Sequence, residues 1–262
     1  MQSITTPDGT DIAYERAGDG PPLVLVHGSA GDHTGWREVL PGLADSFTVY
    51  AIDRRGRGES GDADDYEIER EYADVAAVVE HVAAEHGDEP VSLLGHSYGA
   101  ICSLHAILET DAVDRLVLYE PPLADAPAAE GMAEDLEETI ESEGPEAALV
   151  TFLTEAVEVG DEEIELMRQD DRWENRVASM PTLPREIRAT QRGLFDPDRF
   201  NGVDLPATLL VGGESPERMK EATDRVAAAL DGSRVVELDG EEHIATTTAP
   251  DRFVEVVTDA LG

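Results

Sequence analysis

Short apolar segments alternate with longer amphipathic ones along most of this chain, and the alternation limits the folds it can adopt. The short segments, which we expect to form buried strands, are residues 23–26, 48–52, 91–94, 116–119, 207–211 and 234–238. Stretches with a helical period cover residues 68–86, 217–230 and 250–261. Because strands buried on both faces need helical connections between them, the pattern predicts an α/β fold with a doubly wound, mostly parallel sheet.

The alternation is interrupted between the strand ending at Tyr119 and the strand beginning at Ala207. Residues 123–201 are rich in Glu and Ala, have a helical pattern and contain several Gly and Pro breaks. We therefore expect a helical cap at residues 123–201, inserted into a core domain formed by residues 1–122 and 202–262.

The chain is strongly acidic, with 58 Asp and Glu against 19 Lys and Arg among 262 residues and a formal net charge of -39. Such a charge disfavours nucleic acids and anionic membranes as partners, and it destabilises a compact state unless salt screens the repulsion. We expect a protein from a halophilic organism whose stability falls on dialysis into low salt. An unfolding midpoint that does not change with salt would instead indicate an ordinary acidic protein.

Cys102 is the only cysteine, so the chain cannot form an internal disulfide or a Cys-rich metal site. There is no H-E-x-x-H motif and no phosphate-binding glycine loop, and we expect no metal and no cofactor. The N-terminal segment lacks the pattern of a signal peptide, and no segment is long and apolar enough to span a membrane. We expect a soluble, cytoplasmic protein that acts on a small molecule; its oligomeric state stays open.

The segment Gly95-His96-Ser97-Tyr98-Gly99 follows one predicted strand and precedes an apolar helix. It matches the G-x-S-x-G pattern of a sharp strand-to-helix turn that exposes a nucleophilic serine. Glycine is needed on both sides because a β-carbon there would collide with neighbouring backbone. The alternative is a tight turn that merely contains a hydroxyl group.

Four segments in this order resemble those of the α/β-hydrolase family over nearly the whole chain. They are residues 23–29, like the family's strand and oxyanion loop, residues 53–60, the turn around Ser97, and residues 239–245. The resemblance implies the α/β-hydrolase fold, with a cap inserted after the strand that ends near Tyr119. It says much less about the substrate.

The resemblance and the chemistry together suggest roles for the candidate residues. Ser97 needs a base to take its proton, and His243 follows the last predicted strand, where this fold can return an imidazole to the serine. The oxyanion donors would be the backbone N–H groups of Ser29 and Tyr98. We expect His96 to pack away from Ser97, and His33 is a candidate for lining the pocket.

The acid that would orient His243 has two candidates. Many family members place an aspartate after the strand that follows the cap, but Ser215 stands at that position here. Glu214 is adjacent to it, whereas Glu120 follows the strand ending at Tyr119 and occupies an alternative acid position of the family. We favour Glu120, keep Glu214 as the alternative, and leave open a dyad without an acid.

The resemblance implies a serine esterase or a related hydrolase that forms an acyl-enzyme on Ser97. Dehalogenases and epoxide hydrolases of the family use an aspartate at this position, so the serine argues against both. Carbon–carbon bond hydrolysis, cofactor-free haloperoxidase-like activity and a ligand-binding or receptor role remain alternatives. Apolar cap residues that would contribute to a small or medium pocket, or would only pack the cap, are Phe152, Leu153, Met167, Trp173, Met180, Leu183 and Phe195. Trp36 and Tyr98 are further candidates for the pocket wall.

Overall fold

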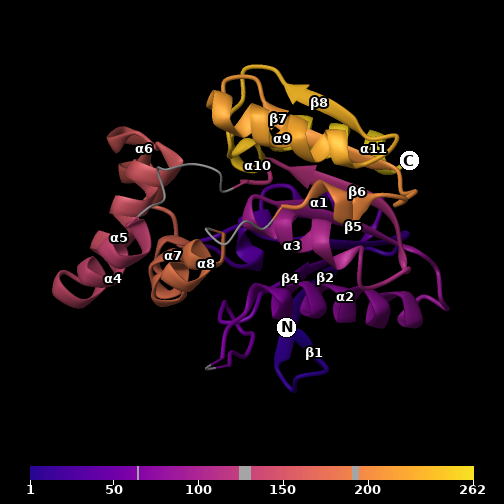
Figure 1. Ribbon diagram of the computed structural model, residues 1–262, viewed down its shortest axis with the longest axis horizontal. Helices are drawn as coiled ribbons and strands as arrows, with labels where there is room; N and C mark the ends of the chain where they lie inside the picture. The colour runs from indigo at the N-terminus through magenta and orange to yellow at the C-terminus, as the bar shows by residue number, and fades with distance from the viewer. Residues whose placement is uncertain (64, 124–130, 191–194) are drawn as a thin grey trace.

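An eight-stranded sheet organises the molecule (Figure 1). The computed structural model describes residues 1–63, 65–123, 131–190 and 195–262. The strands are β1 Gln2–Thr5, β2 Asp11–Ala17, β3 Pro22–Val26, β4 Thr48–Ile52, β5 Val91–His96, β6 Val113–Tyr119, β7 Ala207–Gly212 and β8 Arg234–Leu238, in the spatial order β1-β2-β4-β3-β5-β6-β7-β8.

Strands β3 to β8 are parallel, whereas β1 and β2 form an antiparallel extension at one edge. The doubly wound, mostly parallel sheet predicted from the sequence is therefore confirmed. Strand β5 lies between β3 and β6, so the loops after β3, β5 and β6 open at neighbouring positions on the carboxyl edge of the sheet. Ligand sites in open α/β sheets lie at this edge.

Helices cover both faces of the sheet because the central strands are apolar on both sides. Alternate side chains of β3 enter two separate cores, Val24 and Val26 in one and Leu23 and Leu25 in the other. The first core is closed by α2 Ile68–Glu85, α3 Tyr98–Ala106 and α9 Glu217–Ala229. The second is closed by α1 Leu40–Ala44 and α11 Pro250–Leu261, with α10 Ala245–Thr248 beside it.

The described part of the segment between β6 and β7 is mostly helical and ends with the short helix η5 Pro197–Phe200. We call the helices before η5 the cap helices. They are α4 Met132–Ser142, α5 Pro145–Phe152, η3 Leu153–Val157, α6 Asp161–Met167, α7 Trp173–Ser179, η4 Met180–Thr182 and α8 Leu183–Thr190. They share a hydrophobic cluster that also includes Ala30 of the loop after β3. Figure 1 shows them grouped together to one side of the sheet. The junctions at residues 124–130 and 191–194 lie outside the described residues, so the domain boundaries stay predictions.

The sequence did not predict the shortest elements. The five-residue helix α1, the four-residue helix α10 and the short η1 helix His33–Trp36 are too brief for a periodic pattern to develop. None of the described helices combines the length and apolar character that a membrane span requires.

Candidate active site

Ser97 occupies a strained turn between β5 and α3. Its φ of 54° and ψ of -124° are rare for a residue with a β-carbon. A β-carbon on Gly95 would lie 2.5 Å from the Gly99 carbonyl oxygen, and one on Gly99 would lie 2.3 Å from the Val26 carbonyl oxygen. The two glycines therefore permit the turn, and the Ser97 N–H donates a 2.8 Å hydrogen bond to the carbonyl of Tyr119.

His243 and Glu120 form a direct pair in the structure. His243 Nδ1 lies 2.5 Å from Glu120 Oε2. Because a carboxylate only accepts, Nδ1 carries the proton and Nε2 keeps a free lone pair. The fully buried Glu120 follows β6 with a φ of 46°. Burial alone would raise its pKa, but the hydrogen bond and charge of His243, with further hydrogen bonds, lower the pKa overall.

The second oxygen of Glu120 is held by the loop after β7. Glu120 Oε1 accepts the Gly212 N–H at 2.7 Å and the Ser215 hydroxyl at 2.5 Å. Ser215, which stands where the family resemblance implies an aspartate, is thus a donor to the acid on the neighbouring strand. Glu214 is exposed, and its described contact is a backbone hydrogen bond to Glu241. Of the two acids left open by the sequence, the structure brings Glu120 to His243.

Two aromatic side chains that the sequence did not single out for this purpose hold the loop of His243. His96 Nε2 lies 3.0 Å from the His243 carbonyl oxygen, and its ring stacks on Tyr119 with a centroid separation of 4.8 Å. Burial and the neighbouring His243 lower the pKa of His96 well below its ordinary value, so it is a neutral donor. Tyr119 donates its hydroxyl hydrogen to the Glu242 carbonyl and accepts the Ala245 N–H at 3.0 Å.

The loop after β3 approaches Ser97 closely. A β-carbon on Gly28 would lie 2.9 Å from Ser97 Cβ, so the backbone that leads into Ser29 lies against the nucleophile position. Tyr98 begins α3, and the first N–H groups of a helix have no partner within it. His27 accepts the Arg54 N–H at 3.1 Å, and burial together with the Arg54 charge lowers the pKa of His27 to about 3. Neutral His27 therefore keeps this loop in place.

A cavity of about 110 Å³ lies between the core and the cap helices, and both Ser97 and His243 line it. Of the apolar cap residues for which the sequence left open a pocket or a packing role, Phe152, Leu153 and Met167 line it. The other predicted apolar residues do not: Trp173, Met180 and Leu183 lie within the cap cluster, and Phe195 stacks on Phe200.

Of the two further candidates for the pocket wall, Trp36 lines the cavity and Tyr98 does not. Trp36 also packs against Phe253. The Tyr98 side chain turns away, with its hydroxyl 2.9 Å from the Tyr66 hydroxyl, so the prediction that it forms pocket wall is wrong.

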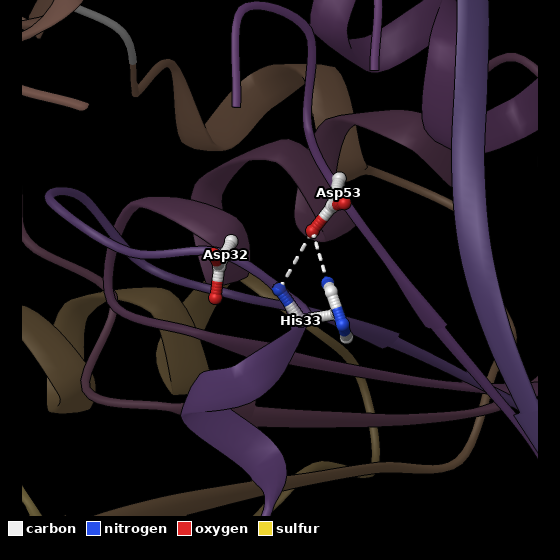
Figure 2. A group of neighbouring side chains, drawn as sticks. All are labelled: Asp32, His33 and Asp53. Atoms are coloured by element: carbon white, nitrogen blue, oxygen red, sulfur yellow. Dashed lines mark hydrogen bonds and ion pairs between the residues drawn. The ribbon is translucent and has the colours of Figure 1, made fainter. Parts of the chain in front are cut away.

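His33 was expected near the pocket, but it forms a pair with Asp53 instead (Figure 2). Asp53 Oδ1 accepts the His33 backbone N–H at 2.8 Å and Nδ1–H at 2.7 Å, and Oδ2 accepts the Glu59 N–H at 2.9 Å. Asp32, His33 and Asp53 each offer one ligand atom within 4.8 Å of the others. Both Asp53 oxygens already accept hydrogen bonds. We therefore interpret the group as one that holds the loop after β3 in place, and we assign it no metal.

This pair makes a pH-dependent contribution to stability. The hydrogen bond with Asp53 outweighs burial and raises the pKa of His33. The contribution is therefore complete below about pH 6.5, the unfolded value, and is lost as the pH rises through the higher folded value. His33→Gln should lower the free energy of unfolding by about 1 kcal/mol more at pH 6 than at pH 9, measured by urea titration. His81→Gln on α2 is the control, and equal losses at both pH values would contradict the assignment.

A buried charge network that no sequence pattern predicted joins the cap to the core. Glu186 of α8 accepts the Ser29 hydroxyl at 2.8 Å and Arg57 at 2.7 Å, and it also pairs with Arg54. Arg54 in turn pairs with Glu71 of α2 at 2.7 Å. All four charged side chains are at most 2% exposed. Helix α8 is thereby fixed to the loop that carries Ser29.

Glu186→Gln should lower the free energy of unfolding by about 3 kcal/mol, because it leaves Arg57 and part of Arg54 buried without a counter-charge. Urea unfolding in molar salt measures the effect. The matched control is Glu137→Gln, which removes a partly exposed pair with Arg188 and should cost less than about 1 kcal/mol. Similar losses in the two variants would mean that the network contributes no more than a surface pair.

The fold, the strained turn at Ser97 and the neighbouring His243–Glu120 pair are together typical of the alpha/beta hydrolases. A sequence model described as the alpha/beta hydrolase family matches residues 23–256. The chain belongs to the alpha/beta hydrolase family.

Individual relatives agree with this assignment. An alpha/beta hydrolase from Sphaerobacter thermophilus DSM 20745 is 31% identical with a TM-score of 0.86, and the alignment covers all of both chains. The esterase RhEst1 from Rhodococcus sp. ECU1013 is 26% identical with a TM-score of 0.79, over 100% of this chain and 98% of that one. A soluble epoxide hydrolase from Corynebacterium sp. (strain C12) is 36% identical over 115 residues, which are 43% of this chain and 39% of that protein.

Proposed function

We propose that the protein is a serine hydrolase that cleaves a small carboxylic ester or related acyl compound through an acyl-enzyme on Ser97. The observation that carries the proposal is the His243–Glu120 hydrogen bond beside the same cavity that Ser97 lines. The bond leaves His243 Nε2 free to accept a proton, which is the tautomer a general base requires.

The reaction follows from this arrangement. The Ser97 hydroxyl attacks the carbonyl carbon while His243 Nε2 takes its proton, and Glu120 stabilises the resulting imidazolium. The N–H groups of Ser29 and Tyr98 stabilise the charge on the carbonyl oxygen. The alcohol leaves with the proton from His243, and a water molecule, deprotonated by the same nitrogen, then releases the acid and regenerates Ser97.

The relatives bear on the choice of reaction. The Rhodococcus protein is named as an esterase, which supports ester chemistry. The Corynebacterium relative is named as an epoxide hydrolase. Ser97 provides a hydroxyl where epoxide hydrolases of this family provide a carboxylate, so we favour acyl transfer over epoxide opening.

The test is hydrolysis of 4-nitrophenyl acetate and butyrate by the folded protein in molar salt. We expect steady turnover and labelling of Ser97 by a fluorophosphonate, located by mass spectrometry of the digested protein. Labelling at another residue, or saturable ester binding without turnover, would contradict the proposal, and the second result would favour a ligand-binding role.

A further inference from the structure

Arg176 of α7 lines the cavity beside the residues of the proposed catalytic site, and its charge is not neutralised by direct contact. Within the ranges that the structure describes, its guanidinium has no carboxylate within 4.0 Å and no hydrogen-bond acceptor. In a chain with 58 acidic and 19 basic residues, acidic partners are abundant. The lack of a carboxylate partner for an arginine that lines the cavity is therefore not explained by a shortage of carboxylates in the chain.

A second observation comes from the neighbouring arginine. Arg172, at the start of α7, lines the same cavity and is 8% exposed. Asp170 binds its Nε at 2.8 Å and its Nη2 at 2.6 Å. The remaining Nη1 is buried and has no hydrogen-bond partner among the described residues. Because this atom is closed off from the cavity, Arg172 contributes positive charge at the cavity wall rather than a hydrogen bond to a ligand.

The nearby acidic groups are already engaged. Asp170 binds Arg172 and also Arg37 at 3.2 Å. Asp32, which lines the cavity, accepts the backbone N–H and the hydroxyl of Thr34. Burial and the charge of Arg172 lower the pKa of Arg176, whereas Asp170 and Asp32 partly oppose this. An anion in the cavity would therefore meet one guanidinium group, that of Arg176, which no carboxylate of the described residues contacts directly.

We propose that the substrate is a small carboxylic ester that also carries a free carboxylate, which binds Arg176 while Ser97 attacks the ester. This proposal rests on the proposed hydrolase function and narrows its substrate class. The cavity of about 110 Å³ is well below the roughly 300–1,000 Å³ of pockets for drug-sized ligands, which favours a short molecule.

The first experiment compares mono-4-nitrophenyl glutarate with 4-nitrophenyl valerate, which has a neutral chain of similar length. Arg176→Gln should lower kcat/KM for the glutarate ester by about 10- to 100-fold more than kcat/KM for the valerate ester, because a charge-assisted hydrogen bond is lost only with the charged substrate. Arg176→Lys should restore part of the loss. Because each ester is compared between variant and wild type, its intrinsic reactivity cancels. A parallel measurement with 4-acetoxybenzoate distinguishes a carboxylate on the alcohol from one on the acyl chain.

The control is Arg188→Gln on α8, where the arginine pairs with Glu134 and Glu137 and does not line the cavity. It should leave both esters unchanged. Assays use the lowest salt concentration at which the protein stays folded, because chloride competes for arginine. Equal losses on charged and neutral esters in Arg176→Gln, or no loss on either charged ester, would overturn the proposal.

Calorimetric titration of Ser97→Ala with glutarate separates this proposal from the hydrolase function. Binding that disappears when Arg176→Gln is added supports the carboxylate site even if no ester is hydrolysed. Absence of glutarate binding, or binding unaffected by Arg176→Gln, overturns it even if neutral esters are hydrolysed.

Discussion

Ser97→Ala is expected to reduce kcat/KM for a 4-nitrophenyl ester by about 10⁵-fold, to the level that binding and the oxyanion donors alone can support. Alanine keeps the β-carbon and the backbone of the turn but removes the hydroxyl oxygen on which the proposed acyl-enzyme would form. The fold should persist, because no hydrogen bond of the Ser97 hydroxyl supports it in the described structure.

Ser103→Ala is the matched control for this substitution. Ser103 lies on the same helix α3, is fully buried, and its hydroxyl has no hydrogen-bond partner among the described residues. Its loss should leave both turnover and the unfolding midpoint nearly unchanged. Ester hydrolysis that survives in Ser97→Ala would show that another group is the nucleophile.

Glu120→Gln is expected to lower kcat by about 10⁴-fold with little change in KM. The amide group must place its NH₂ beside either His243 or the Gly212 N–H, and both are donors to the native carboxylate. With the NH₂ facing His243, the ring must accept at Nδ1 and carry its proton on Nε2. That tautomer cannot remove a proton from Ser97.

Glu214→Gln is the comparison that decides between the two acids left open by the sequence. The exposed Glu214 side chain should tolerate the change with less than about a twofold effect on kcat, since exposed substitutions away from a site are close to neutral. Stopped-flow measurement of the acylation burst in both variants reports the chemical step directly. A larger loss in Glu214→Gln than in Glu120→Gln would reverse the assignment.

Local patterns were sufficient to predict the strands and helices that build the sheet. Residues 48–52 and 234–238 were predicted with the bounds that the structure has. The first is buried as expected, but the expectation of a buried strand at 234–238 is wrong, because β8 lies at the edge of the sheet and is largely exposed. Ser97 was singled out because its turn is encoded within five consecutive residues. The prediction of His243 depended on the order of the strands and helices, because His243 follows Ser97 by 146 positions in the chain.

Contacts between distant segments could not be predicted in this way. Glu120 and Glu214 both follow strands that end at the same edge, so only their positions in space show which one contacts His243. Glu186 pairs with Arg54 and Arg57, which lie about 130 residues earlier in the chain. The sequence around Glu186 does not differ from that of an ordinary acidic, exposed helix face, so its burial could not be predicted. That Arg176 has no carboxylate partner among the described residues is visible only when every carboxylate near it in space is examined.

The anchoring of α8 by Glu186 has a consequence for how ligands enter and leave. Displacing that helix would expose two guanidinium groups and release the Ser29 hydroxyl, so the segment that supplies a proposed oxyanion donor would lose its support at the same time. We therefore expect access to the cavity through movement of the segment from α5 to α7, which carries the cap residues that line it, rather than through displacement of all the cap helices. A hinge on that side would open the cavity while the contacts that hold Ser29 and the His243–Glu120 pair stay in place.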